Sequence, residues 1–152
     1  MTIFSGCEIS RRRGEYLRYI LEKGGTVRAR ELAEQFGVDP STITKAVRDL
    51  SSEGLVYHTP YRCISLTDEG EEYAGFLLRR HRILGLVLSR HGLSGEEACS
   101  QARQMEASLP RSCVDKMCAT LGHPTQGICG EIPHDESCCS GHIRMDGRKS
   151  RG

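Results

Sequence analysis

The sequence predicts a mainly α-helical fold with one small β hairpin, and three observations support this class. Apolar residues recur at helical spacing over most of residues 10–121. Two helical patterns are joined by a short turn that contains Gly37. Behind them, the β-prone runs Leu55–His58 and Cys63–Leu66 flank a tip that contains Pro60. We therefore expect a helix-turn-helix with a hairpin wing, followed by further helices.

The first two helices are predicted from their apolar faces and their ends. Residues 10–23 place Leu17 and Ile20 on one face, and Gly24-Gly25 ends this helix. Residues 27–38 form a shorter amphipathic pattern that ends at the glycine turn. Its inward-facing residues are Leu32, Ala33 and Phe36.

Residues 39–50 have the pattern of a helix that enters a DNA groove. Asp39 can cap its first turn, and Pro40 fits the first helical position, where no amide donor is needed. One face is apolar, and the rest carries short hydroxyls and cations, the residue types that meet phosphates and base edges. An ordinary surface helix could carry the same residues, but the preceding helix and turn favour the DNA-binding interpretation. The candidate contacts here are Ser41, Thr42, Thr44, Lys45 and Arg48.

The hairpin after this helix completes a winged helix. Its tip, residues 59–62, contains a proline and a cation. We add Arg28 at the start of the second helix, and His58 and Arg62 on the wing, to the residues expected to contact double-stranded DNA.

The second half of the chain is predicted to be helical as far as residue 121. Thr67 can cap a long helix that runs to about Arg90, with His81 on its apolar stripe, and Ser94 with Glu97 has the spacing of a capping box. The helix that follows places four apolar residues on one face, and a last helix spans residues 111–121. Those four residues are Ala98, Ala102, Met105 and Leu109. The expected domains are a winged helix at 1–66, a helical domain at 67–122, a Cys/His-rich segment at 123–140 and a disordered basic tail at 141–152.

Composition limits the partners of the chain. It has 21 basic and 20 acidic residues, so DNA affinity must come from local cations and from pairing two copies. The apolar residues from Leu77 to Leu88 exceed what one small core needs, which predicts a homodimer. No apolar run is long enough for a membrane span, and the N-terminus lacks a signal peptide. We expect a cytoplasmic protein with reduced thiols.

Several motifs share their order and spacing with a known family. They are Glu15–Ile20, Pro40–Lys45, Leu66–Gly70, Arg79–Leu84 and Gly122–Pro124. Over roughly residues 14–139, the chain resembles the metal-dependent repressors of the diphtheria-toxin-repressor and manganese-transport-regulator type. The resemblance implies a winged-helix domain followed by a helical dimerisation domain, in which bound Fe(II) or Mn(II) favours the dimer that fits an operator. Because the chain stops early, it also implies a short form without an SH3-like third domain.

The resemblance also implies a metal site between the first helix and the dimerisation helices. Glu15, His81 and Glu106 fall at ligand positions, and Cys99 lies on the same helix face as Glu106, where it could substitute for a missing ligand. The alternative is that His81 is a core histidine and that the two carboxylates form salt bridges with arginines.

This sequence departs from the family pattern at three ligand positions. Ala107 stands where the family usually has histidine, Arg103 where it has cysteine or glutamate, and Arg18 where manganese-type members have a carboxylate. A guanidinium offers no lone pair, whereas a divalent ion needs about four to six donors. The sequence therefore predicts a depleted family site.

Cysteines supply a different candidate site. Five of the eight cysteines lie between residues 113 and 139, and clustered cysteines in a reducing compartment indicate metal or redox chemistry. Thiolates favour iron or zinc over manganese, and an iron–sulfur cluster is an open alternative. The simpler alternative is that these cysteines are small buried hydrophobic residues or lie loose in a tail. The candidate ligands are Cys113, Cys118, Cys129, Cys138 and Cys139.

These observations predict a dimeric, sequence-specific transcriptional regulator that responds to a metal such as iron, and the resemblance favours a repressor. An iron–sulfur or thiol-based redox sensor on the same winged helix is the nearest alternative. A metal- or thiol-dependent enzyme, or a metal-storage protein, is the alternative of another class. The sequence contains no nucleophile–base motif, phosphate loop or CxxC pair to favour an enzyme.

Overall fold

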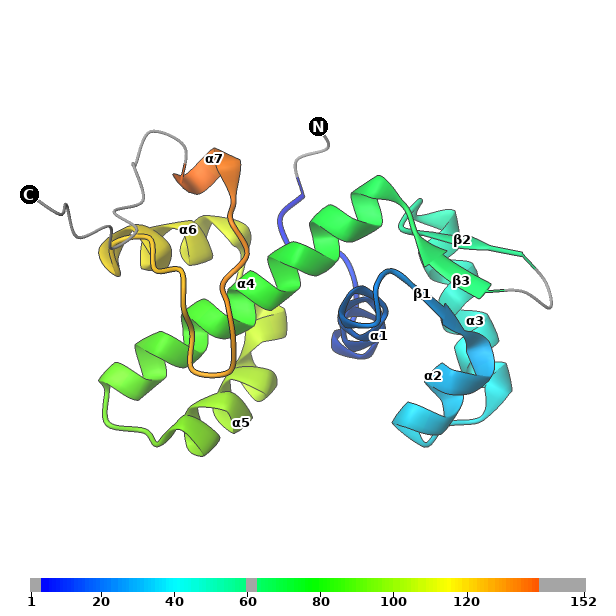
Figure 1. Cartoon of the computed structure of the whole chain (residues 1–152), viewed down its shortest axis with the longest axis horizontal. Helices are drawn as coiled ribbons and strands as arrows, with labels where there is room; N and C mark the ends of the chain where they lie inside the picture. Colours follow the sequence, from blue (N-terminus) through cyan, green and yellow to red (C-terminus); the bar gives the residue numbers. More distant parts are fainter. Residues whose placement is uncertain (1–3, 60–62, 140–152) are drawn as a thin grey trace, which may run out of the picture.

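The computed structural model describes residues 4–59 and 63–139. Within these ranges the long helix α4 joins a winged-helix half to a helical half (Figure 1). This arrangement confirms the predicted mainly α fold with a small sheet. The elements are α1 (Arg11–Glu22), β1 (Thr26–Arg28), α2 (Ala29–Phe36), α3 (Pro40–Ser52), β2 (Val56–His58), β3 (Cys63–Leu66), α4 (Asp68–Arg90), α5 (Gly95–Met105), the 3-10 turn η1 (Glu106–Ser108), α6 (Arg111–Thr120) and α7 (Glu136–Cys139).

The α2–turn–α3 unit has the predicted form, with one difference at the cap. Gly37 ends α2 in the left-handed region, at φ 60°, which glycine adopts at little cost. Pro40 begins α3 as predicted. Asp39, however, makes no side-chain capping bond, and only its carbonyl accepts, from the Thr42 amide at 2.9 Å. The apolar face of α3 is buried through Ile43, Val47 and Leu50.

The sheet contains a strand that the sequence prediction missed. A helix was expected from Val27, but Thr26–Arg28 form β1 and the helix begins only at Ala29. β1 pairs antiparallel with β3, so β3 lies between β1 and β2 and Val27 faces Ile64. Val27 is β-branched and buried, and its packing against the sheet outweighs the local helical pattern.

Helix α4 begins where the sheet ends. As predicted, Thr67 caps it, and its hydroxyl accepts from the Gly70 amide at 3.0 Å. Gly70 is required here, because a Cβ at this position would overlap the carbonyl oxygen of Leu55. This close approach ties the first turn of α4 to the winged helix, and α1 also packs against α4.

The helical half packs around the second part of α4. The predicted capping box of Ser94 and Glu97 is confirmed at the start of α5. The expected inward position of Met105 is wrong, since its side chain is 50% exposed. Helix α5 ends at this residue and tightens into η1, so the helical spacing that aligned Met105 with Leu109 no longer applies.

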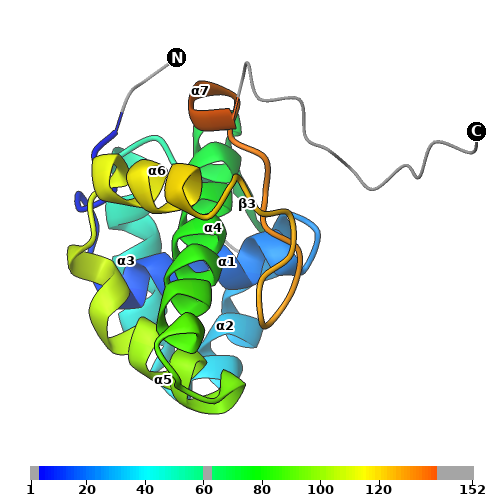
Figure 2. The same cartoon turned by 90° about the vertical axis from the view of Figure 1, so that its left-hand side faces the viewer.

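The segment after α6 runs along α4 towards α5, turns, and returns to α7 (Figures 1 and 2). Its turn is closed by a bridge between Gln126 and Glu131. The predicted basic tail, residues 141–152, and the wing tip, residues 60–62, lie outside the described residues. Within the described ranges, no helix is long and apolar enough to cross a membrane.

Candidate metal centre and DNA interface

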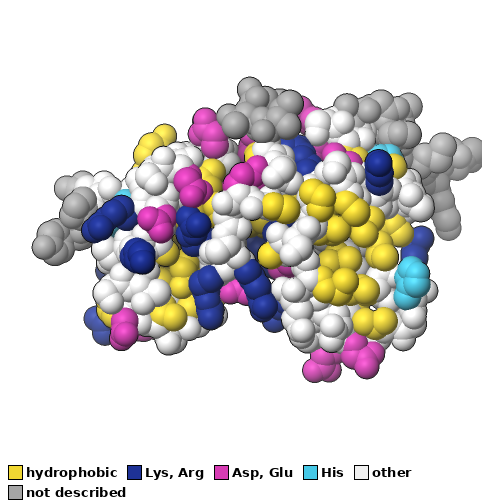
Figure 3. Space-filling model, turned by 180° about the vertical axis from the view of Figure 1, so that it is seen from behind, with side chains coloured by type: hydrophobic (Ala, Val, Ile, Leu, Met, Phe, Trp, Pro, Cys, Tyr) yellow, Lys and Arg dark blue, Asp and Glu magenta, His cyan; other side chains and the backbone are white. Residues whose placement is uncertain are grey.

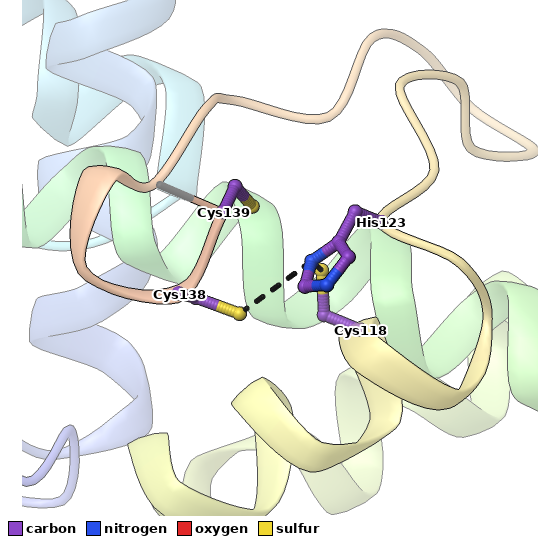
Figure 4. Close-up of side chains that lie close together, drawn as sticks. All are labelled: Cys118, His123, Cys138 and Cys139. Carbon is purple, nitrogen blue, oxygen red and sulfur yellow. Dashed lines mark hydrogen bonds between the residues drawn. The ribbon is translucent and has the colours of Figure 1, made fainter. Parts of the chain in front are cut away.

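Three thiols and one imidazole converge where the end of α6 meets α7 (Figure 4). Their donor atoms all lie within 4.8 Å of one another. His123 Nδ1 is 3.5 Å from Cys118 Sγ and 3.9 Å from Cys138 Sγ. A tetrahedral zinc ion, with bonds of about 2.3 Å to sulfur and 2.0 Å to nitrogen, separates two such ligands by roughly 3.6 Å. The donor set, which Cys139 completes, therefore fits Zn(II) or Fe(II).

The end of α6 brings Cys118 and His123 together. Cys118 lies in the last turn of this helix and is 1% exposed. His123 follows Gly122 and has φ 53°, and its amide donates to the Cys118 carbonyl at 2.8 Å. A non-glycine residue in the left-handed region is uncommon and often marks a functional position. Here this backbone conformation directs the imidazole towards the thiols (Figure 4).

Asp135 positions the Cys138–Cys139 pair. Its carboxylate accepts from the Cys138 amide at 2.9 Å and from Arg111 Nη2 at 2.8 Å. Burial opposes ionisation of this carboxylate, but hydrogen bonds from the Ser137 hydroxyl and the Cys138 amide, together with nearby guanidinium groups, lower its pKa. A charged Asp135 therefore anchors α7 to α6.

Arg79 of α4 supplies positive charge next to the thiols. Its side chain is 1% exposed and lies 2.8 Å from Asp115 and 3.8 Å from Asp135. Burial raises the pKa of Cys118 and, with the neighbouring thiols, raises the pKa of Cys138 to about 12 despite this guanidinium. Without a metal Cys118 and Cys138 keep their protons, whereas a coordinating ion deprotonates its thiol ligands.

The structure groups the predicted cysteines differently from the sequence. Three of the five form this cluster, together with His123, which sequence reasoning left out of the ligand set. Cys129 lies instead beside His81 and Cys99, and Cys113 belongs to neither group. We revise the predicted set accordingly. The signal for His123 was present in the sequence, because it precedes Pro124 directly after a helix-ending glycine.

The residues at the family ligand positions form a polar network. His81 Nδ1 lies 2.6 Å from Glu106 Oε2, and Arg18 Nη1 lies 3.1 Å from Glu106 Oε1. Glu15 does not join them, since it pairs with Arg11 at 3.3 Å. It lines the same shallow hollow as Arg18 and Glu106. Arg18 thus places a positive charge directly beside Glu106.

The predicted DNA contacts on α3 share one exposed surface. On the wing and around it, Arg28 is exposed and His58 is half-buried, while Arg62 lies outside the described residues. Sequence reasoning missed Tyr57, a strand residue that is 66% exposed. The exposed residues of α3 are Ser41, Thr42, Thr44, Lys45 and Arg48.

The helical half carries an apolar surface. Hydrophobic side chains gather over the half built from α4, α5 and α6 (Figure 3), and Met105 is its most exposed large apolar residue. The sequence predicted that the apolar residues from Leu77 to Leu88 exceed the needs of one core. Those of α4 up to Leu84 are, however, buried within the chain itself. The half-buried ones are Leu86, Val87 and Leu88.

A winged helix joined to a helical half with a thiol–imidazole cluster defines a class, the metal-dependent winged-helix regulators. Comparison with known families agrees. The model for "Iron dependent repressor, N-terminal DNA binding domain" matches residues 8–64, and that for "Iron dependent repressor, metal binding and dimerisation domain" matches residues 67–136. The chain belongs to the iron-dependent repressor family, whose members are transcriptional repressors and not enzymes.

Individual relatives support this assignment. The HTH-type transcriptional regulator MntR of Lysinibacillus sphaericus (strain C3-41) is 28% identical over 103 residues, which cover 68% of this chain and 74% of that protein. The crystal structure of a hypothetical protein from Sulfolobus solfataricus has a TM-score of 0.73 at 27% identity. The matched region covers 83% of this chain and 100% of the Sulfolobus chain. A manganese-dependent transcriptional repressor in complex with manganese has a TM-score of 0.65 at 28% identity. The matched region covers 81% of this chain and 62% of the repressor chain.

Proposed function

We propose that the chain is a homodimeric regulator that binds an operator in double-stranded DNA. A transition-metal ion bound where α6 meets α7 sets its affinity for that operator. The proposed ligands are Cys118, His123, Cys138 and Cys139. The observation that carries the proposal is the convergence of these donor atoms within 4.8 Å of one another, because clustered thiols and imidazole are the ligands of closed zinc sites. We place the protein in the reducing cytoplasm, where its thiols stay available for metal.

Zinc or Fe(II) is the ion we expect, rather than Mn(II). Thiolates are soft donors, and Mn(II) is hard and stands lowest in the order of affinities. Manganese is the metal in the similar repressor complex, but in this chain Arg18 lies 3.1 Å from Glu106. A guanidinium beside that carboxylate supplies charge and no lone pair, which argues against a manganese site there.

The metal supplies energy that folds the segment between α6 and α7. Among its described residues, Ile132 is buried, whereas Ile128 is 37% exposed, so apolar burial alone stabilises this segment weakly. In small metal-bound segments the binding energy is folding energy. The cluster also contacts α4 through Arg79. Occupancy therefore acts on the helix that connects the two halves.

The exposed face of α3 is the surface we assign to the operator. Lys45 and Arg48 offer charge to phosphates, and Thr44 and Ser41 can reach base edges. The chain is nearly neutral, so one winged helix gives few contacts, and a two-fold pair doubles them. We assign the pairing surface to the apolar face of the helical half in Figure 3, which requires half-sites about one DNA turn apart or a multiple of it.

Operator binding as a function of metal tests this function. The full chain would first select its operator from a library of random duplexes, and fluorescence anisotropy would then follow binding with Zn(II), with Fe(II) under anaerobic conditions, and with a chelator. We expect the metal-dependent change in affinity to be lost when Cys118, Cys138 and Cys139 are replaced by serine. It should persist in the matched control Cys113→Ser.

Two results would contradict the proposal. One is an unchanged metal response in the triple serine variant. The other is the absence of any selected operator in every metal state. Brown anaerobic protein with acid-labile sulfide would show that the same cysteines hold an iron–sulfur cluster instead of a single ion.

A further inference from the structure

Two cysteines from different elements lie close together outside the cluster at α7. Cys99 belongs to α5 and Cys129 to the turn between α6 and α7, and their sulfur atoms lie within 4.8 Å of each other. The sulfur atoms of a disulfide are about 2.05 Å apart. A further approach of less than about 3 Å would therefore join the two thiols, and neither of them is a ligand of the proposed metal centre.

The turn that carries Cys129 is fixed against α4 and α5. Arg82 of α4 donates a hydrogen bond to the Glu131 carbonyl. Ile128 packs at the start of α5, where a Cβ on Gly95 would come within 3.0 Å of its side chain. These contacts hold Cys129 beside α5 in the reduced chain. A reaction between the two thiols is therefore intramolecular and needs little further ordering.

The two thiols differ in their exposure to solvent. Cys129 is exposed, whereas Cys99 is half-buried and its Sγ lies 3.6 Å from Nε2 of the buried His81. A small oxidant in solvent therefore meets Cys129 first, and Cys99 lies next to it as a second thiol. Redox-sensing cysteines are often exposed in this way and placed beside a thiol that completes the reaction.

We propose that Cys99 and Cys129 form a reversible disulfide when the chain meets a hydroperoxide. The Cys129 thiolate attacks the peroxide, an S–O bond forms and the O–O bond breaks, which leaves a sulfenic acid. The proton lost by Cys129 passes to the released hydroxide or alkoxide. The Cys99 sulfur then attacks the Cys129 sulfur, the S–S bond forms and the S–O bond breaks. The released hydroxide and the Cys99 proton leave as water, so two electrons pass from the thiol pair to one hydroperoxide.

The cysteines at α7 are less accessible to an oxidant than this pair. Cys118 and Cys139 are 1% and 3% exposed. The proposed disulfide ties the middle of the segment that joins His123 to Cys138 directly to α5. In a reducing cytoplasm such a bond is transient and thiol reductants reverse it. Any effect of this tie on metal release or DNA binding rests on the proposed function, whereas formation of the disulfide does not.

Peptide mapping of the full chain tests the disulfide. Reduced protein in chelator would receive one equivalent of hydrogen peroxide, be alkylated, and be digested with trypsin for mass spectrometry without reductant. We expect a cross-link between peptide 91–103, which contains Cys99, and peptide 117–144, which contains Cys129. In the triple serine variant of the cluster at α7, Cys129 is the one cysteine left in its peptide, so the same cross-link there identifies the bond. A thiol reductant should remove the cross-link.

Single variants separate the two steps and do not depend on the triple variant. In Cys99→Ser the second thiol is missing, so dimedone, which traps sulfenic acids, should label Cys129. Cys129→Ser should give neither this adduct nor the cross-link, and Cys63→Ser, at another exposed cysteine, should match wild type. A dimedone adduct on Cys129 of wild type without any cross-link would overturn the proposal. A Cys129 that stays reduced in peroxide, or that pairs with a cysteine other than Cys99, would overturn it as well.

Discussion

Replacing Arg79 by methionine should lower both stability and metal affinity. Arg79 is 1% exposed, while its partners Asp115 and Asp135 are 32% and 11% exposed. Breaking a buried ion pair by removing one partner costs about 3–5 kcal/mol. Here solvent screens Asp115, and Asp135 keeps Arg111 at 2.8 Å, so we expect a loss of about 2 kcal/mol. Zinc affinity should fall about tenfold or more, as for other residues that support metal ligands.

Urea unfolding, followed by circular dichroism with chelator and with Zn(II), measures both effects. The free energy of unfolding should fall in both conditions, and more in zinc, because weaker binding also reduces the stabilisation by ligand. Arg30→Met is the matched control, since the Arg30–Glu34 pair has similar geometry, 2.9 Å, but its side chains are 89% and 67% exposed. It should change stability by less than about 0.5 kcal/mol. Equal stability and equal zinc affinity of Arg79→Met and wild type would refute the assigned role of Arg79.

Three further predictions follow from the fold and the interface. Gly70→Ala should destabilise the chain by about 3 kcal/mol in urea unfolding, because its Cβ meets the backbone of Leu55. Burial alone would raise the pKa of Glu8, but hydrogen bonds from the Ser5 backbone and the Tyr73 hydroxyl lower it to about 2. The ionised Glu8 therefore stabilises the fold above about pH 4.5, and this contribution is lost as pH falls towards 2. Glu8→Gln should remove roughly 1 kcal/mol at pH 7, after allowance for exposure, and flatten that acid slope; an unchanged acid titration would contradict this. Lys45→Ala should weaken operator and random DNA alike and reduce the salt slope by about one; an unchanged slope would exclude a phosphate contact.

Local patterns in the sequence predict most of the helices. The caps at Thr67 and Ser94 and the proline that begins α3 occur where expected, because each depends on residues within one turn of helix. Strand β1 was missed, because Val27 is strand only through its pairing with Ile64. That contact joins residues distant in sequence, and local helical spacing carries no information about it.

The candidate site was predicted in part. Residue types identified a thiol-rich region, but proximity in sequence grouped Cys129 with the cysteines near α7. The turn instead carries Cys129 across α4 to Cys99, a path set by packing of Ile128 and Arg82 and not by ligand spacing. The pairing of Arg18 with Glu106 matches the salt-bridge alternative that the sequence had left open for this carboxylate.

X-ray absorption at the zinc edge tests most directly that three thiols and one imidazole hold the ion at α7. The sample would be the Cys99→Ser, Cys129→Ser chain with one equivalent of Zn(II), so that only this cluster is loaded. The account predicts three sulfur ligands at about 2.3 Å and one nitrogen ligand at about 2.0 Å. A coordination sphere of oxygen and nitrogen alone would contradict it.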